Sequence, residues 1–164
     1  MCQKITPKEN CNIIVARSEN KLIGNQGRLP WDCPEDMQHF KAVTSGHICL
    51  AGYTTYRTLP QQGLPNRTLY VLTSRHCENL PHVFFLKSMD EFFRLPIPAG
   101  QQIFCIGGLQ VYKSFLPYTS KIYLTEIAGN FTGDTFFQDD FLNGFKRKLI
   151  NETKSCRYFL YTRK

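Results

Sequence analysis

The feature of this sequence that most constrains its fold is a regular alternation of two kinds of segment. Short runs of apolar and β-branched residues, typical of buried strands, occur at residues 11–17, 47–51, 68–73, 82–86, 102–106 and 121–127. Between them, apolar residues follow helical spacing at residues 34–44, 53–59, 88–95 and 109–116. Strands that alternate with helices predict an α/β fold with a mainly parallel central sheet and helices on its faces.

The last part of the chain departs from this alternation. Residues 145–150 and 157–163 alternate like strands, and a polar turn at residues 151–155 joins them with no helix between. We therefore expect an antiparallel hairpin at one edge of the sheet. A chain of 164 residues suits one domain, so we predict a single domain over residues 1–164, with a mixed sheet of about eight strands and about four flanking helices.

Loops rich in Gly, Pro and Asn are expected at residues 24–30, 60–66 and 129–134. The first of these loops runs into the apolar stretch Leu29-Pro30-Trp31. We expect it to act as a lid that closes over a ligand and excludes water.

The cysteine pattern and the charge limit the classes of function. The chain has seven cysteines, with no C-x-x-C pair or other zinc spacing, so we expect free thiols and no metal site.

The formal net charge of +7 suits an anionic ligand, and it also fits a solvated basic surface with no specific partner. The densest basic run, Lys146-Arg147-Lys148, lacks interleaved aromatic residues, which argues against nucleic-acid binding. No apolar run is long enough to cross a bilayer and the first residues do not resemble a signal peptide, so we expect a cytoplasmic protein without membrane contact.

Three of the predicted strands end in residues that suit the phosphates of a dinucleotide. The strand ends carry Gly107-Gly108, Gly52 with Tyr53-Thr54-Thr55 after it, and Ser74-Arg75-His76. Glycines let a phosphate approach the backbone, and hydroxyl, guanidinium and imidazole groups can bind its oxygens. Each pattern alone also fits a tight turn without a ligand, and the G-x-G-x-x-G fingerprint is absent. Because the ends of parallel strands meet at one edge, the three together predict a dinucleotide site there.

Asp36 is the sharpest single candidate for chemistry. Pro34 fits the first turn of a helix, with Asp32 as the N-cap and Glu35 three residues later. Asp36 then lies four residues before Phe40, on the helix stripe that faces the interior. Acidic residues also favour the first turn of any helix, where the dipole stabilises them, so a purely structural role stays open. In an apolar pocket a carboxylate can instead pair with an amino-substituted nitrogen heterocycle, and burial would raise its pKa towards the range of proton transfer.

Short motifs follow one another in a specific order along nearly the whole chain. They are Ile14-Val15-Ala16, Leu22-Ile23-Gly24, Leu29-Pro30-Trp31, Pro34-Glu35-Asp36, Phe40-Lys41, Ala51-Gly52, Leu64-Pro65-Asn66-Arg67, Ile106-Gly107-Gly108, Val111-Tyr112, Leu124-Thr125 and Gly133-Asp134-Thr135. In this order and spacing they resemble the dihydrofolate reductase family, and the chain length resembles its bacterial type. The resemblance implies an NADP-dependent oxidoreductase that reduces 7,8-dihydrofolate to 5,6,7,8-tetrahydrofolate for one-carbon metabolism. Hydride would pass from NADPH to C6 of the pterin while N5 is protonated.

The resemblance also implies a role for each residue of the substrate site. Asp36 matches the catalytic residue, the one ionisable group of the pocket, which binds the 2-amino group and N3 side of the pterin and assists protonation at N5. Thr125 would support this carboxylate, and Arg67 would bind the α-carboxylate of the glutamate tail. The implied substrate-binding residues are Ile14, Val15, Leu29, Asp36, Met37, Phe40, Leu64, Arg67, Ile106, Tyr112 and Thr125, and the same pocket would bind antifolate inhibitors.

The cofactor site that the resemblance implies departs from the family at two positions. Tyr53 stands where the family usually has Arg or Lys near the adenosine phosphates, and Gln110 stands where some members have Arg. Ser74, Arg75 and His76 remain to recognise a 2′-phosphate, so we expect NADPH rather than NADH. The implied cofactor-binding residues are Ala16, Ile23, Gly52, Tyr53, Thr54, Thr55, Leu72, Thr73, Ser74, Arg75, Gly107, Gly108, Leu109, Gln110, Val111 and Tyr112. The family also has a cis bond between Gly107 and Gly108, and its members are by default monomers.

Two other functions stay open on the sequence alone. A reductase of the same fold could act on another heterocycle, as the pyrimidine reductase of riboflavin synthesis does. Trp31 followed by Asp36 on an apolar helix, together with Arg67, favours folate instead. A binding protein without enzymatic activity, driven by the positive charge, is the alternative from another class.

Overall fold

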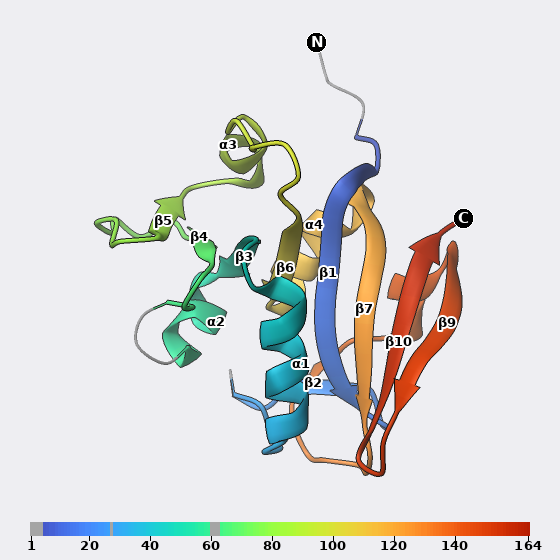
Figure 1. The fold of residues 1–164 in the computed structure, drawn as a ribbon. Helices are drawn as coiled ribbons and strands as arrows, with labels where there is room; N and C mark the ends of the chain where they lie inside the picture. Colours follow the sequence, from blue (N-terminus) through green and yellow to red (C-terminus); the bar gives the residue numbers. More distant parts are fainter. Residues whose placement is uncertain (1–4, 27, 60–62) are drawn as a thin grey trace.

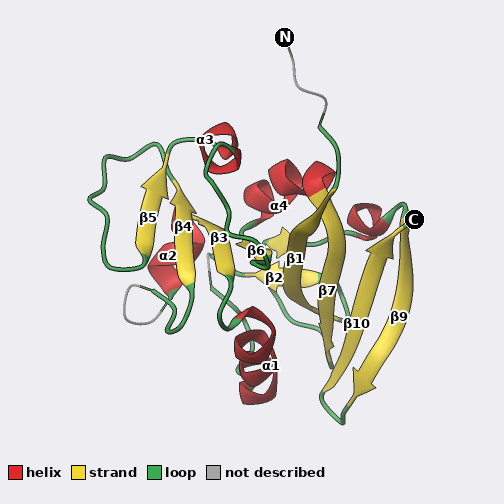
Figure 2. Ribbon diagram, turned by 45° about the horizontal axis from the view of Figure 1, so that its top comes forward, coloured by secondary structure: helices red, strands yellow, loops and turns green. Residues whose placement is uncertain are grey.

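The computed structural model describes residues 5–26, 28–59 and 63–164, and these residues build one eight-stranded sheet. Its strands follow the order β5-β4-β3-β6-β1-β7-β10-β9, which can be followed across Figure 2. Every pairing from β5 to β7 is parallel, whereas β10 is antiparallel to both β7 and β9. The predicted mixed, mainly parallel sheet is therefore confirmed. The strands are β1 (Lys8–Ser18), β3 (Ile48–Gly52), β4 (Thr68–Leu72), β5 (Val83–Leu86), β6 (Ile103–Gly107), β7 (Thr119–Ile127), β9 (Phe145–Glu152) and β10 (Cys156–Arg163).

Helices lie on both faces of the sheet, and each falls where helical spacing predicted one. Figure 1 shows α1 in front of the sheet and α4 behind it. The bounds of α1 match the prediction, and the other helices end one or two residues early. The helices are α1 (Pro34–Thr44), α2 (Tyr53–Thr58), α3 (Met89–Phe93) and α4 (Leu109–Phe115), with 3₁₀ turns at Leu116–Tyr118 and Asp139–Leu142.

Strand β3 shows why these apolar runs become central strands. Ile48 and Leu50 belong to the larger core cluster, which includes Phe115 of α4. Cys49 and Ala51, the alternate residues, belong to a second cluster against which Tyr53 and Tyr56 of α2 pack. A strand covered by helices on both faces must be apolar throughout, which explains its continuous hydrophobic run.

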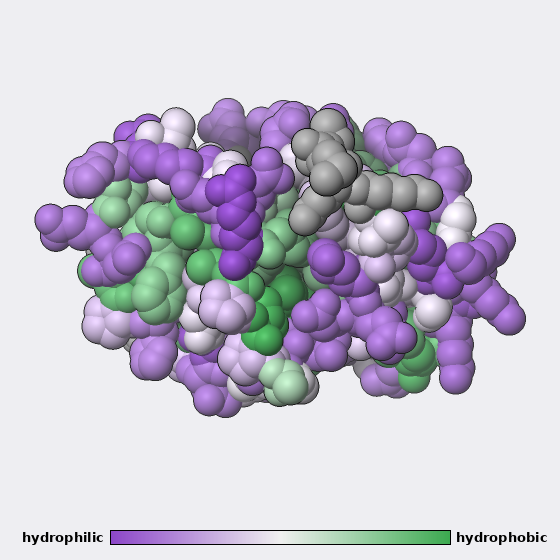
Figure 3. Space-filling view, turned by 90° about the horizontal axis from the view of Figure 1, so that it is seen from above, coloured by the Kyte–Doolittle hydropathy of each residue, from purple (hydrophilic) through white to green (hydrophobic). Residues whose placement is uncertain are grey.

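The two edges of the sheet differ in character. Edge strand β9 carries Lys146, Arg147 and Lys148 exposed to solvent, and charges of this kind discourage pairing with another chain. At the opposite edge, Phe84 of β5 is exposed and stacks on Tyr70 of β4, with ring centroids 5.4 Å apart. Figure 3 shows apolar surface gathered on this side of the molecule, over α3 and β5.

The C-terminal hairpin is confirmed, but its strands are longer than predicted and β9 does not bury alternate residues. Only Phe145 of this strand is buried, and both Leu149 and Ile150 are exposed. The register with β10 shifts beside Ile150, so that residue has no partner across the ladder and the alternation breaks there.

A small two-stranded sheet was not predicted. It pairs β2 (Leu22–Gly24) with β8 (Thr135–Phe136) in antiparallel fashion. Gly133 lies so close to β2 that a Cβ on it would fall 2.6 Å from the backbone oxygen of Gly24. Strands this short have too few residues to show a period, so hydrophobic patterning could not have revealed them.

The start of α1 corrects the sequence prediction. The N-cap is Cys33 rather than Asp32, and no side chain caps the helix. Glu35 is not part of a capping box, because its carboxylate accepts hydrogen bonds from the Thr153 hydroxyl, 2.5 Å away, and from the Tyr158 hydroxyl, 3.0 Å away. Glu35 thus ties the first turn of α1 to the C-terminal hairpin.

Some sequence predictions fall partly outside the described residues. Gly27, in the predicted lid loop, and residues 60–62, in the second predicted loop, lie outside the described residues. The six described cysteines are free thiols, as expected, whereas Cys2 lies outside the described range. Within the described part of the chain, no helix is long and apolar enough to span a membrane.

Candidate active site

Helix α1 carries Asp36 into the interior of the protein. Asp36 and Thr44 are its buried residues, and Asp36 is only 9 % exposed. Burial raises the pKa of Asp36 above its ordinary value, while hydrogen bonding by the Thr125 side chain and the nearby His39 act in the opposite direction. A carboxyl group with a raised pKa inside an apolar wall is the pattern that marks functional acids.

The strands β1 and β7 supply the floor beneath this carboxyl group. Ala16 of β1 pairs with Thr125 of β7, and the Thr125 side chain is buried. The hydroxyl of Tyr112, on α4, donates a hydrogen bond to the backbone carbonyl of Ile14 at 2.9 Å. Burial raises the pKa of Tyr112 well above its ordinary range, so this hydroxyl keeps its proton and remains a donor. Side chains from α1, α4 and β7 thus meet beside β1.

The apolar residues predicted for the pocket wall differ in burial. Val15 is buried, and Phe40, Leu64 and Ile106 are partly buried. Leu29 and Met37 are both 52 % exposed, so neither belongs to the core. Large apolar side chains left at the surface are typical of sites that a ligand covers.

Arg67 is held in a fixed geometry although it carries a charge. The residue is 7 % exposed, its Nε donates to the Pro65 carbonyl at 2.9 Å and its Nη1 donates to the Thr44 hydroxyl at 3.1 Å. The guanidinium carbon lies 5.6 Å from the centroid of the Phe40 ring. Burial lowers the pKa of Arg67, which nevertheless stays charged because guanidinium groups titrate far above neutrality. Arg67 and Phe40, both predicted for the substrate site, therefore lie together.

The glycine-bearing strand ends come together at one edge of the sheet. A Cβ on Gly52 would lie 3.8 Å from both the Gly107 oxygen and the Gly108 nitrogen, and 2.9 Å from Cγ2 of Val111. Gly107 has a φ of +120°, which side chains other than glycine rarely adopt, and its bond to Gly108 is cis. The Thr55 hydroxyl lies against both glycines of that pair. The end of β3 and the end of β6 thus approach each other through their backbones, and the side chains of Val111, Tyr112 and Thr55 pack against the glycines.

The third strand end lies beside the second, because β4 pairs with β3. The backbone N–H of Arg75 donates to the Thr73 hydroxyl at 3.0 Å. Lys87 was not predicted, yet its ammonium group donates to the carbonyl oxygens of Ser74 and Arg75, at 3.1 Å each. Lysine just after a strand carries no distinguishing pattern, so the sequence offered no signal for it.

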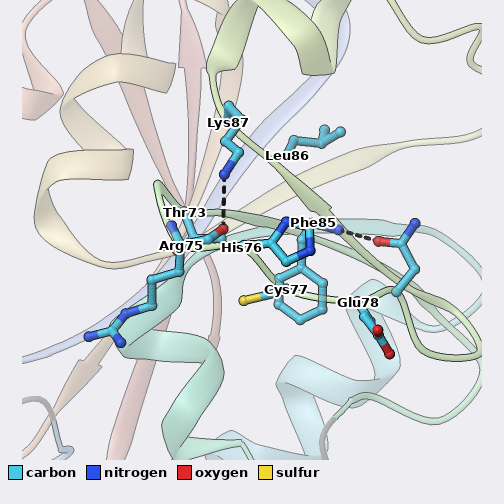
Figure 4. A pocket seen from close by; sticks show the side chains of 9 residues that line it. Thr73, Arg75, His76, Cys77, Glu78, Phe85, Leu86 and Lys87 are labelled. Carbon is cyan, nitrogen blue, oxygen red and sulfur yellow. Dashed lines mark hydrogen bonds between the residues drawn. The ribbon is translucent and has the colours of Figure 1, made fainter.

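A cavity of about 430 Å³ opens beside this turn and is lined by residues of the β4–β5 loop and of β5. Figure 4 shows the side chain of Arg75 pointing away from His76 and Cys77. Its guanidinium lies instead over the ring of Tyr53, the first residue of α2, with 4.8 Å from the guanidinium carbon to the ring centroid. Arg75 therefore contributes to the lining of the cavity, while its guanidinium extends to the ring of Tyr53.

The remaining predicted cofactor residues differ in burial. Thr54, Ser74 and Gln110 are exposed, and the others are partly buried; these others are Ala16, Ile23, Leu72, Leu109 and Val111. No group of His, Cys, Asp and Glu side chains placed to hold a metal ion occurs in the segments that the structure describes.

The loop that leads into Trp31 is held at its beginning by Asp134. The Asp134 N–H donates to the Gly24 carbonyl at 3.2 Å, and its carboxylate accepts from the Gln26 N–H at 3.1 Å. Trp31 packs on Phe131 with ring centroids 5.5 Å apart. The described residues of the loop therefore rest on the segment that precedes β8.

Comparisons with known proteins agree with this geometry. The family model for dihydrofolate reductase matches residues 10–158. Dihydrofolate reductase of Staphylococcus aureus is 33% identical over 126 residues, which make up 77% of this chain and 76% of that protein. The enzyme of Bacillus subtilis (strain 168) is 35% identical over 129 residues, which make up 78% of this chain and 75% of that protein.

A solved structure gives the same result for the fold. Dihydrofolate reductase from Enterococcus faecalis, complexed with NADP(H) and RAB-propyl, aligns with a TM-score of 0.82 and 29% identity, over 93% of this chain and 95% of that chain. The family match spans most of the chain, so a reductase specific for pyrimidines is set aside. The chain belongs to the dihydrofolate reductase family.

Proposed function

We propose that Asp36 holds the pterin ring while this protein reduces 7,8-dihydrofolate to 5,6,7,8-tetrahydrofolate with NADPH. The observation that carries the proposal is the buried Asp36 carboxyl, with its raised pKa, at the carboxyl edge of the sheet of a dihydrofolate reductase fold. The Enterococcus faecalis relative with this fold was solved with NADP(H). When bound, NADPH supplies the hydride that C6 of the pterin receives.

The contribution of Asp36 is to bind and orient the ring. Its carboxylate can accept two hydrogen bonds, one from the 2-amino group and one from the N3 side of the pterin. These bonds are strong because burial keeps water from competing for the same oxygens. A negative charge here also favours the cationic pterin that forms when N5 is protonated. We expect the proton to reach N5 through water.

Residues around Asp36 complete the pterin site. The carbonyls of Ile14 and Ile106 would face the ring, and the Ile14 carbonyl keeps a free lone pair beside the Tyr112 hydroxyl that it already accepts. Val15, Leu29 and Met37 would cover the apolar faces of the ring. Antifolate inhibitors with an amino-substituted ring would bind the same carboxylate.

Arg67 would bind the glutamate tail of the substrate. Its Nε and Nη1 groups are already engaged by Pro65 and Thr44, so the guanidinium cannot rotate freely. A fixed, charged fork suits the α-carboxylate of a glutamate. Phe40, which lies under the guanidinium, would contact the chain between pterin and glutamate.

The residues at the three strand ends fit NADPH. Gly52, Gly107 and Gly108 carry no Cβ, so a pyrophosphate would approach their backbone directly, beside the Thr55 hydroxyl that lies against Gly107 and Gly108. Hydroxyls on Thr54, Thr55 and Ser74 can donate to phosphate oxygens, and the Arg75 guanidinium supplies a permanent charge. These groups would bind and orient the cofactor, and the loop that Asp134 holds would exclude water from the reaction.

We further propose that the protein works as a monomer in the cytoplasm and does not use nucleic acid as a partner. Its basic run lies on the exposed edge strand β9, away from the carboxyl edge of the parallel strands. Size-exclusion chromatography with light scattering tests the oligomeric state. Salt-sensitive binding of nucleic acid without NADPH oxidation in the presence of dihydrofolate would contradict the proposal.

The experiment that tests the role of Asp36 compares D36N with D32N, which changes an exposed aspartate two residues before the same helix. NADPH absorbance is followed after dihydrofolate is added, with an antifolate to confirm specificity. We expect D36N to fold and to lose about 100-fold or more in hydride transfer at neutral pH. Part of the rate should return in acid, where the substrate is already protonated. D32N should keep its rate, and a D36N rate near wild type at neutral pH would refute the proposal.

A further inference from the structure

We propose that Tyr53 is a positioning residue that aims the Arg75 guanidinium at the 2′-phosphate of the cofactor. The inference rests on the NADPH-dependent function proposed above. Tyr53 occupies a position where the family usually has Arg or Lys, so this chain offers an aromatic face there instead of a charge. The guanidinium carbon of Arg75 lies 4.8 Å from the centroid of that face.

The backbone of Arg75 is fixed before any ligand arrives. Its N–H donates to the Thr73 hydroxyl at 3.0 Å, and Lys87 donates to its carbonyl and to that of Ser74. The N–H of Lys87 in turn donates to the carboxylate of Glu91 at 2.7 Å. These bonds set the direction in which the Arg75 side chain leaves the turn, but they do not restrict its outer torsions.

Tyr53 supplies the restriction that the backbone cannot. Its ring is packed against Tyr56, with centroids 6.0 Å apart, and Tyr56 meets Phe85 of β5 edge to face at 5.3 Å. The row of rings connects α2 to β5, so the face of Tyr53 has a fixed place relative to the turn that carries Arg75. Figure 4 shows the Arg75 side chain extended and pointing away from His76 and Cys77.

Stacking leaves the donors of Arg75 available. The guanidinium carbon lies over the Tyr53 ring. An arginine that stacks on an aromatic ring does so through the flat face of the guanidinium, and its N–H groups then point outward at the edge of that plane. An exposed arginine otherwise loses considerable rotamer entropy when it binds a phosphate. Tyr53 holds the Arg75 guanidinium in place before the ligand binds and so reduces that loss of entropy. The affinity therefore rises only for ligands that carry the 2′-phosphate. Gln110, on the neighbouring helix α4, is exposed and brings no charge.

The test measures nucleotide binding without substrate, by titration calorimetry at constant ionic strength. The probes are 2′,5′-ADP, which carries the 2′-phosphate, and 5′-AMP, which lacks it. We expect R75Q to weaken the binding of 2′,5′-ADP by roughly 10- to 100-fold and to change the binding of 5′-AMP little. Y53L should weaken the binding of 2′,5′-ADP by roughly 2- to 5-fold, again with little effect on the binding of 5′-AMP.

The double variant separates positioning from a general structural effect. If Tyr53 acts through Arg75, Y53L adds nothing in the R75Q background. Y53F keeps the ring and should retain the affinity for 2′,5′-ADP. R57Q removes an equal charge from the last turn of α2 and should lower the affinity for 2′,5′-ADP less than R75Q does.

Two results would overturn the inference. The first is that Y53L weakens the binding of both nucleotides alike, or weakens the binding of 2′,5′-ADP equally with and without Arg75. The second comes from R75K, which keeps the charge without the flat guanidinium and does not depend on the folding of Y53L. Wild-type affinity of R75K for 2′,5′-ADP would show that stacking is unimportant. The proposed function fails separately if NADPH oxidation does not depend on dihydrofolate. These binding measurements contain no dihydrofolate, so they test the role of Tyr53 alone.

Discussion

Asp36 and Arg67, at the substrate end of the proposed site, are buried and fixed by their surroundings, whereas Ser74 and Arg75, at the adenosine end, are exposed. Two hydrogen bonds from its side chain hold Arg67, but a single stacking contact with Tyr53 guides the guanidinium of Arg75. Both ends have to recognise an anionic group. At the substrate end Arg67 does so with a charge that is desolvated in advance, and at the adenosine end Arg75 does so with a charge that stays in water.

The difference has an energetic meaning. A charge that is already desolvated makes a stronger bond to its ligand, but the folded protein bears the cost of its burial. An exposed charge costs the fold almost nothing and gives a weaker, salt-sensitive contact. Substitutions at the two ends should therefore affect different properties, and the following predictions test this from the largest effect to the smallest.

Apart from the loss of hydride transfer already expected for D36N, the largest effect should come from R67L. Loss of a charged, pre-positioned donor should raise the KM for dihydrofolate by roughly 10- to 100-fold, with a smaller effect on kcat. A pterin substrate without the glutamate tail should show no such increase. Steady-state kinetics with both substrates measure the effect. R67K keeps the charge but loses the planar fork, so its KM for dihydrofolate should lie between those of the wild type and R67L. Equal losses on the two substrates would contradict the role of Arg67.

The stability of D36N provides a second test. Because burial raises the pKa of Asp36, the folded state binds this proton more tightly than the unfolded state, and wild-type stability falls as pH rises from the ordinary value of 3.8 through the folded pKa. At neutral pH the neutral Asn side chain avoids this cost, so D36N should melt at a higher temperature than wild type. The gain should disappear in acid, where the wild type carries the proton in both states. A lower Tm for D36N at neutral pH would contradict the account.

A smaller effect is expected for T125V. The Thr125 side chain lowers the pKa of Asp36 by hydrogen bonding, so its removal should move that pKa further upward. Carboxyl ¹³C chemical shifts of the free enzyme, followed through a pH titration, report the change. T125S keeps the hydroxyl and should behave like the wild type. An unchanged titration in T125V would show that Thr125 does not contact the carboxylate.

The smallest effect should be that of R75Q on stability. Arg75 is exposed and forms no salt bridge within the described part of the chain, so its replacement should change the free energy of unfolding by no more than about 0.5 kcal/mol. Thermal unfolding without ligand measures this, with R67L as the comparison at the other end of the site. A loss of stability in R75Q as large as in R67L would remove the contrast between the two ends.

Local pattern was enough to predict most of the fold. The run at residues 47–51 becomes a strand buried on both faces, and the helical spacing from Pro34 to Thr44 gives α1 with the same bounds. The strand was predicted from a continuous apolar run and the helix from apolar residues at helical spacing, and both patterns are local in the sequence. The strands β2 and β8 escaped prediction because two or three residues cannot display a period.

The site was less accessible to sequence reasoning. A buried Asp36 and three strand ends at one edge followed from spacing and topology, but the substrate and the individual roles came only from family resemblance. The interpretation of Glu35 as a capping residue failed because its partners, Thr153 and Tyr158, are far away in the chain. The stack of Arg75 on Tyr53 likewise joins residues from different elements, which no local pattern encodes.

The tie between Glu35 and the C-terminal hairpin also bears on the order of events during synthesis. The residues that it joins are separated by 118 and 123 positions, so α1 leaves the ribosome long before Thr153 and Tyr158 exist. Contacts of such separation close late in folding, after the loop between them has been ordered. The first turn of α1 therefore gains this anchor only after Thr153 and Tyr158 have been synthesised, and a nascent chain that stops before them lacks it.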